Sequence, residues 1–235
     1  MKNFLLSNKF ILAVMRYHAY RIRIFVEKMA LDCDIDGKRI LDIGACDIPY
    51  EKFFKKAIYC SQDIVQNKNK TIDYICDINK GLIGVENESF DYILCTQVLE
   101  HLKKPHIAFK EFDRILKPNG KVFLTTHLCF EEHMIPYDYF RFTKYGLKYL
   151  GESNNFKLAR IKPHGGIFHL IALIFSTLPI KLFIKRETVW YYLYLTVFFI
   201  PIFLFNSLCF VLDFLDRERN MTINYECVYE KNIKK

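Results

Sequence analysis

Short apolar runs alternate with polar or helical segments between residues 38 and 126. Five runs rich in Ile, Val, Phe and Tyr predict buried strands: KRILDI, AIYCS, TIDYIC, FDYILC and KVFLTT. Before the last of them, PHIAFKEFDRIL carries an apolar stripe at helical spacing, begins with a proline, and ends at the turn sequence KPNG. Strands that alternate with helices predict an α/β fold, with a mostly parallel sheet covered on both faces.

The pattern changes after Pro163, where two long apolar stretches follow one another. GGIFHLIALIFSTLPIKLFI and VWYYLYLTVFFIPIFLFNSLCFVLDFL both reach the length of a membrane span. The next segment, TINYECVYEK, alternates between apolar and polar residues and predicts a strand that rejoins the sheet. The apolar segment before it must therefore cross the membrane an even number of times or not at all. We therefore expect an apolar helical hairpin at residues 165–215, inserted before the last strand and lying in the cytoplasmic leaflet. A two-span hairpin and a dimer interface remain alternatives.

The first 37 residues predict a basic amphipathic helix, followed by one domain at residues 38–235. The chain has a formal net charge of +8, and basic residues dominate its start. Lys9 interrupts the early apolar region and no cleavage site follows, so we do not expect secretion. The eight cysteines form no C-x-x-C pair, which indicates reduced thiols. We expect the cytoplasmic face of a membrane as the location, and no nucleic acid among the partners.

Polar residues follow four of the predicted strands, and the carboxyl ends of parallel strands are where open sheets bind ligands. An aspartate about 20 residues beyond the first loop stands at the spacing suited to a ribose. Aspartate at a strand end is also common as a turn former or helix cap, so each position has a purely structural alternative. The candidates, in chain order, are Asp42, Gly44, Asp63, Asp77, Thr96 and Gln97.

Three of these segments resemble the class I S-adenosylmethionine-dependent methyltransferases. They are RILDIGACDIPY, DYICDI and FDYILCTQVLEHLKKPHIAFKEFDRILKPNGKVFLTT. The resemblance implies a Rossmann-like seven-stranded sheet whose last strand is antiparallel, and S-adenosyl-L-methionine as cofactor. It also implies the site: Gly44 and Ala45 against the amino-acid part of the cofactor, Asp63 on the ribose, Asp77 and Ile78 at the adenine, Asp42 bracing the loop, and Thr96 and Gln97 on the sulfonium side.

The first loop departs from the G-x-G-x-G pattern of such enzymes, because Cys46 and Ile48 stand at the later glycine positions. A sulfonium amino-acid ligand carries no pyrophosphate, so the backbone need not approach it as closely as it approaches a dinucleotide. The loop therefore fits this cofactor better than a nicotinamide nucleotide.

A segment beyond the fifth strand resembles the H-x-x-P-x-D-Y-x-R-x-T stretch of a methyltransferase branch associated with glycan and polysaccharide assembly. In that branch it covers the methyl-transfer side of the pocket, which makes His133 the first candidate for a catalytic base and Asp138 the second. Alternatively, His133 and Arg141 only tie the loop to the sheet. The adjacent Glu100 and His101 lack the spacing of metal ligands, so we expect no metal site.

Together these features predict a methyltransferase that transfers a methyl group to an oxygen of a membrane-associated acceptor. A glycan or lipid-linked saccharide is the leading candidate, and a quinone-type lipid or other small molecule is the alternative. A nicotinamide-dependent oxidoreductase would need G-x-G-x-x-G after the first strand, and a catalytically silent membrane scaffold would lack cofactor binding. The sequence sets neither the acceptor nor the oligomeric state.

Overall fold

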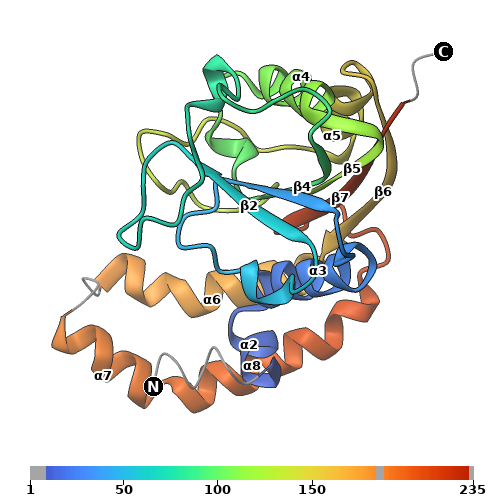
Figure 1. Cartoon of the computed structure of the whole chain (residues 1–235). Coiled ribbons are helices and arrows are strands. Elements are labelled where there is room, and N and C mark those ends of the chain that lie inside the picture. Colours follow the sequence, from blue (N-terminus) through green and yellow to red (C-terminus); the bar gives the residue numbers. More distant parts are fainter. Residues whose placement is uncertain (1–8, 184–187, 233–235) are drawn as a thin grey trace. The chain divides into compact units, whose positions relative to one another are not determined.

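The structure is a computed structural model that describes residues 9–183 and 188–232. The chain divides into two compact units, which we describe separately (Figure 1). The sheet unit comprises residues 22–162 and 225–235, and the helical unit comprises residues 1–21 and 163–224. The boundaries differ from the predicted ones because the first basic segment and the apolar insertion cluster together, although they are far apart in sequence.

A seven-stranded sheet forms the centre of the fold, with strand order β3-β2-β1-β4-β5-β7-β6. The first five strands pair in parallel, and the last strands run antiparallel, as predicted. Their bounds are β1 Arg39–Ile43, β2 Ile58–Asp63, β3 Tyr74–Ile75, β4 Phe90–Thr96, β5 Leu116–His127, β6 Phe156–His164 and β7 Asn224–Lys231.

The predicted KPNG turn lies inside β5 and does not precede it. Phe90 pairs with Leu116, whereas Tyr92 pairs with Lys121, so the intervening residues form an irregularity in the ladder. Asn119 has a φ of 64°, the left-handed conformation that asparagine tolerates in turns. The turn residues thus act as a bulge within one strand.

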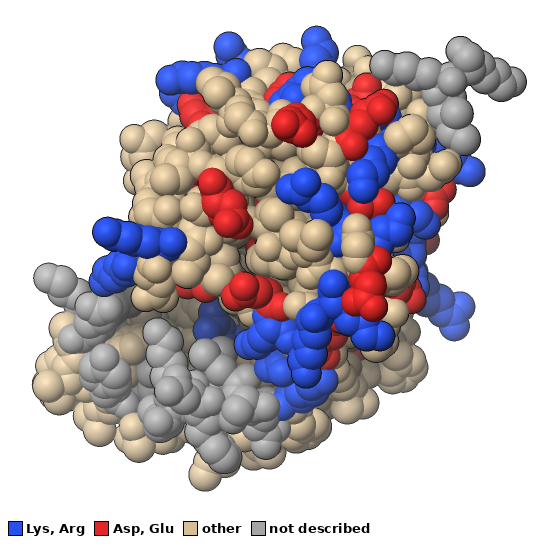
Figure 2. Space-filling model, in the orientation of Figure 1, with Lys and Arg blue, Asp and Glu red and all other residues tan. Residues whose placement is uncertain are grey.

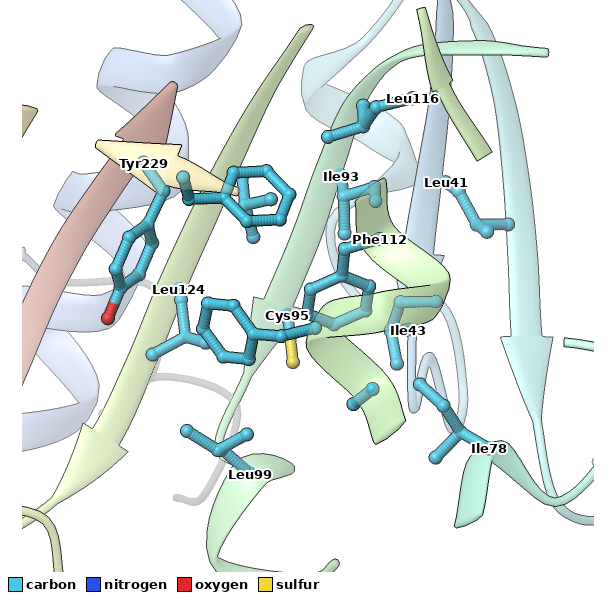
Figure 3. Packing of buried hydrophobic residues seen from close by; sticks show 14 of the residues in the cluster. Leu41, Ile43, Ile78, Ile93, Cys95, Leu99, Phe112, Leu116, Leu124 and Tyr229 are labelled. Carbon is cyan, nitrogen blue, oxygen red and sulfur yellow. The ribbon is translucent and has the colours of Figure 1, made fainter. Parts of the chain in front are cut away.

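Helices cover both faces of the sheet. They are α3 Tyr17–Cys33, α4 Pro105–Ile115 and α5 Lys144–Glu152, with the short helices η1 Glu51–Phe53, η2 Ile78–Lys80 and η3 Leu99–His101. On one face, Phe112 of α4 packs with Cys95 and Leu124 of the central strands (Figure 3). On the other face, Phe25 of α3 packs with Phe123. The sheet is therefore buried on both sides, as its continuous apolar strands predicted.

The helical unit contains α2 Lys9–Met15, the start of α3, α6 Ile167–Phe183, α7 Val189–Val197, α8 Phe199–Leu212 and the short helix η4 Asp213–Leu215. Two acidic side chains tie the start of α6 to the segment that follows α8. Asp213 Oδ1 accepts a hydrogen bond from the Gly166 amide at 2.9 Å, and Asp216 Oδ2 accepts one from the Ile167 amide at 2.7 Å. These carboxylates satisfy amides that an α-helix leaves without partners at its amino end.

Residues 165–215 were predicted as an apolar helical hairpin, and their described part contains α6, α7, α8 and η4. Within residues 9–183 and 188–232, no helix has both the length and the apolar character to cross a membrane. The association of this segment with a membrane stays a prediction.

Candidate functional site

The loop after β1 is held close to the neighbouring strand ends. Gly44 has a φ of +67°, and a Cβ atom at this position would lie only 2.4 Å from Val98 Cγ2. The Ala45 amide donates to the Gln62 carbonyl at 2.9 Å. Asp63 Oδ2 accepts a hydrogen bond from the Cys46 amide, also at 2.9 Å. Asp63, the predicted ribose ligand, thus also fixes the loop that is predicted to contact the cofactor.

Two non-glycine residues adopt left-handed backbone conformations in this loop. Cys46 has a φ of 48° and Ile48 a φ of 46°. These are the positions at which similar loops carry glycine, and the conformation is strained for side chains with a Cβ, most of all for a β-branched one. The loop therefore has the backbone shape of a G-x-G-x-G loop, although only its first glycine, Gly44, is present.

Asp42, at the end of β1, is almost fully buried, with 1% of its surface exposed. Burial raises the pKa of its carboxyl group to about 7, and the nearby charge of Asp63 acts in the same direction. The Tyr59 hydroxyl donates a hydrogen bond to Asp42 Oδ2 and partly offsets this rise. Asp42 is thus bound to β2 through Tyr59, and its predicted role in bracing the loop stays a prediction.

The remaining predicted cofactor residues follow β3 and β4, and so belong to the same carboxyl edge of the sheet. Asp77 caps η2 by accepting a hydrogen bond from the Asn79 amide at 3.0 Å, and Ile78 behind it is buried. Thr96 ends β4. Gln97 has a φ of 56° and donates from Nε2 to Thr125 Oγ1 at 2.9 Å. The edge is assembled as predicted, and the role of each residue toward the cofactor stays a prediction.

His133, the predicted base, is oriented by Asp138. The distance from His133 Nδ1 to Asp138 Oδ2 is 3.3 Å. Arg141 donates to both oxygens of Asp138, at 2.6 and 2.7 Å, and holds the pKa of that carboxyl group well below its usual range. A carboxylate stabilised in this way is a poor proton acceptor at neutral pH. The geometry thus favours Asp138 as an orienting group for His133 over a second base.

Two further residues lie at this edge: Glu100, which the sequence suggested only as a poorly spaced metal ligand beside His101, and His127, which was not among the predicted site residues. Glu100 of η3 is fully buried, and burial raises the pKa of its carboxyl group to about 7. Its Oε2 accepts a hydrogen bond from Thr126 Oγ1 at 2.8 Å, and its Oε1 lies 3.4 Å from His127 Nε2. The signal for His127 was present, since it is a polar residue at the carboxyl end of a predicted strand, as are the other candidates.

Glu100, His127 and His133 together form a compact cluster. One oxygen or nitrogen atom from each lies within 4.8 Å of those of the other two. Such a group can bind and release protons or hold a cation at the carboxyl ends of β4 and β5. The structure therefore combines, on one unit, a loop suited to a small cofactor and a cluster suited to activating a second molecule.

Comparisons with known proteins agree with this arrangement. The family described as "Methyltransferase domain" matches residues 15–154. Ubiquinone biosynthesis O-methyltransferases are similar over part of the chain. The protein from Idiomarina loihiensis is 37% identical over 103 residues, covering 38% of this chain and 42% of that protein. The one from Xanthomonas oryzae pv. oryzae is 28% identical over 111 residues, covering 40% and 44%. The chain thus spans less than half the length of these relatives.

Solved structures are similar in fold. The 1,6-didemethyltoxoflavin-N1-methyltransferase of Burkholderia thailandensis, which has S-adenosylhomocysteine bound, is 12% identical with a TM-score of 0.56, over 99% of this chain and 89% of that one. At this identity the likeness supports the fold alone. The matched family covers more than half of the sequence, including every strand of the cofactor edge. The chain therefore belongs to the methyltransferase-domain family, as the resemblance in its sequence predicted.

Proposed function

We propose that this protein transfers a methyl group from S-adenosyl-L-methionine to a hydroxyl oxygen on the ring of a quinone-type lipid. The methyltransferase class and its cofactor follow from family membership. The choice of oxygen and of a lipid acceptor is supported by the features that follow.

The observation that carries the proposal is the cluster at the carboxyl edge. A hydroxyl group has to lose its proton as its oxygen attacks the sulfonium methyl carbon. His133, with Asp138 3.3 Å from its Nδ1, and the buried Glu100 supply groups that can take up this proton. Such an arrangement suits an acidic hydroxyl, such as that of a phenol or quinol. Groups as weakly basic as imidazole and carboxylate remove a proton from an acidic hydroxyl more easily than from an ordinary alcohol.

The helical unit supports a lipid acceptor. Its surface exposes large apolar side chains that include Phe175, Leu178, Phe183, Trp190, Leu193, Val197, Phe198, Leu204 and Val211. Residues 189–212, which span α7 and α8, include no Lys, Arg, Asp or Glu, whereas such residues are frequent in blue and red elsewhere on the face that Figure 2 shows. Large apolar side chains exposed side by side in this number mark an interaction site. A cavity of about 320 Å³ also lies in this unit, lined by residues from Phe183 of α6 and from α7 to Phe198. We propose that this surface docks on the cytoplasmic face of a membrane, in which a lipid acceptor is dissolved.

The curated relatives favour the quinone-type acceptor over the glycan acceptor that sequence analysis put first. They are named for O-methylation in ubiquinone biosynthesis. The glycan acceptor remains the second candidate, because the segment from His133 to Thr143 resembles one found in glycan-associated enzymes.

The proposal is tested with full-length protein, S-adenosylmethionine carrying an isotopically labelled methyl group, and defined acceptors. One is a catechol with a long isoprenoid tail in anionic vesicles, one is the same ring without the tail, and one is a polyprenyl-linked saccharide. We expect methylated catechol, detected by mass spectrometry, and no methylated saccharide. The reverse result would replace the quinone-type acceptor with the glycan, and no product from any acceptor would refute the proposal.

Two variants separate the parts of the proposal. His133→Ala should lower turnover about 10²- to 10⁴-fold while leaving cofactor affinity nearly unchanged, the range typical of a lost proton acceptor. Trp190→Glu should lower the rate with the long-tailed acceptor in vesicles only, because Trp190 lies on the exposed apolar surface that is proposed to dock on the membrane. Equal losses with both catechols would contradict a membrane-docking role for this surface.

A further inference from the structure

We infer that Glu100, His127 and His133 form a binding site for a divalent cation of the Zn²⁺ class. The three side chains come from η3, from the last residue of β5 and from the loop after it. One ligand atom of each lies within 4.8 Å of those of the other two. Two imidazoles and one carboxylate are a ligand set that binds zinc and leaves a further coordination position open.

The carboxylate of Glu100 lacks a partner that a cation would provide. The residue is fully buried, and Oε2 is satisfied by the Thr126 hydroxyl at 2.8 Å. Oε1 has no hydrogen-bond partner and lies 3.4 Å from His127 Nε2. An ionised carboxylate with an unsatisfied buried oxygen is costly, so a cation bound between Oε1 and the imidazole would remove a real energetic penalty.

All three side chains have a neighbour that fixes their orientation. Metal-bound histidines usually donate their second ring N–H to a carboxylate or carbonyl, which sets the tautomer. His133 Nδ1 lies 3.3 Å from Asp138 Oδ2 and 3.2 Å from the Glu131 carbonyl, which leaves Nε2 for the ion. The His127 ring stacks on Phe130 with a centroid distance of 4.3 Å and an interplanar angle of 5°.

The spacing requires only a small adjustment. Ligand atoms bonded at about 2.0 to 2.2 Å in a tetrahedral site are separated from one another by roughly 3.3 to 3.6 Å. Glu100 Oε1 and His127 Nε2 already have this separation, at 3.4 Å. His133 lies on the loop after β5, and 26% of its side chain is exposed, so it is the ligand that can close on the ion.

The role of the ion rests on the proposed function. A hydroxyl bound at the open position would lose its proton to solvent, because coordination lowers the pKa of the hydroxyl. Its oxygen would then bond to the cofactor's methyl carbon while the carbon–sulfur bond breaks and its electron pair stays on sulfur. The products are the methyl ether and S-adenosylhomocysteine. In this state His133 is a metal ligand, and the ion replaces it as the group that activates the hydroxyl.

Direct metal binding tests the site without any acceptor. Full-length protein is stripped with a chelator and titrated with Zn²⁺ by calorimetry, and with Co²⁺ by its visible absorption. We expect about one ion per chain, bound by three protein ligands with one coordination position left open. His127→Gln and His133→Gln should each weaken binding at least about 100-fold, because even outer-shell changes cost about 10- to 100-fold. His106→Gln is the matched control, since His106 is exposed on α4 outside the cluster, and it should bind as wild type does.

Binding of no ion, or wild-type binding by both His127→Gln and His133→Gln, would overturn the site. Circular dichroism and cofactor titration show whether these variants are folded, and Glu100→Gln, which keeps the side-chain shape, provides a second test of the same site. The catalytic role has its own test: methyl transfer should slow in chelator, where only His133 is left to take up the proton, and recover with Zn²⁺. An unchanged rate in chelator would overturn the catalytic role of the ion. A chain that binds the ion and methylates no acceptor would support the site while refuting the proposed function.

Discussion

Replacing Gly44 with alanine tests whether the loop after β1 is held by close backbone packing. The left-handed conformation, φ +67°, costs an alanine about 1 to 2 kcal/mol. The added Cβ would lie 2.4 Å from Val98 Cγ2, so one of them has to move, at a cost of about 1 to 3 kcal/mol for overpacking. We therefore expect Gly44→Ala to destabilise the protein by about 2 to 5 kcal/mol and to weaken cofactor binding.

Gly37→Ala is the matched control. Gly37 has a similar φ of +77°, and a Cβ there would meet no atom within 4 Å. Both substitutions reduce the freedom of the unfolded chain equally, so the difference between them isolates the contact with Val98. We expect that difference to be about 1 to 3 kcal/mol.

Urea unfolding followed by far-ultraviolet circular dichroism measures these free energies of unfolding. Tryptophan fluorescence reports on the other unit, because Trp190 is the only tryptophan of the chain. Adding Val98→Ala to Gly44→Ala should recover most of the contact cost when compared with Val98→Ala alone. If Gly44→Ala and Gly37→Ala are equally destabilising within about 0.5 kcal/mol, the close-packing argument is refuted.

Three further predictions concern the loop, the cofactor and pH. Cys46→Gly should stabilise the protein by up to about 1 kcal/mol in urea unfolding, because Cys46 is exposed and strained at a φ of 48°; a loss of stability would show that its side chain is needed. Asp63→Ala should weaken S-adenosylmethionine binding by about 1.5 to 3 kcal/mol in calorimetry, and Asp47→Ala, on the same exposed loop, should not; equal affinities for the two variants would remove Asp63 from the ribose site. Burial, together with the positive charge of Arg16, lowers the pKa of His18 to about 4. The unfolded chain then binds more protons between pH 4 and 6.5, so stability falls as the pH drops through this range, by up to about 2 kcal/mol at pH 5. His18→Gln should lose correspondingly less stability between pH 7 and 5, and identical pH profiles would contradict the assignment.

The strands of the cofactor edge could be predicted because each is a short apolar run with a polar residue directly after it. This local pattern, together with the rule that parallel strands end at one edge, was enough to predict the positions of Asp42, Asp63 and Asp77. The family resemblance then assigned their expected roles.

The cluster around Glu100 could not be predicted in the same way. Glu100 and His127 are 27 positions apart and meet only because β4 and β5 pair in parallel and end together. In the sequence Glu100 stands beside His101, but the Nδ1 atom of His101 faces the Tyr137 carbonyl, at 2.6 Å. Adjacent residues in a sequence point in different directions, so a ligand set assembled from two strand ends leaves no characteristic spacing.

The strand order also affects how the protein is made. β7 lies between β5 and β6, yet it is the last strand to be synthesised, after all of α6, α7 and α8. Until residues 224–231 leave the ribosome, the nascent chain has an open slot in its sheet between two unpaired strand edges. The apolar helices α6, α7 and α8 are therefore complete before the sheet that belongs to the methyltransferase domain is able to close.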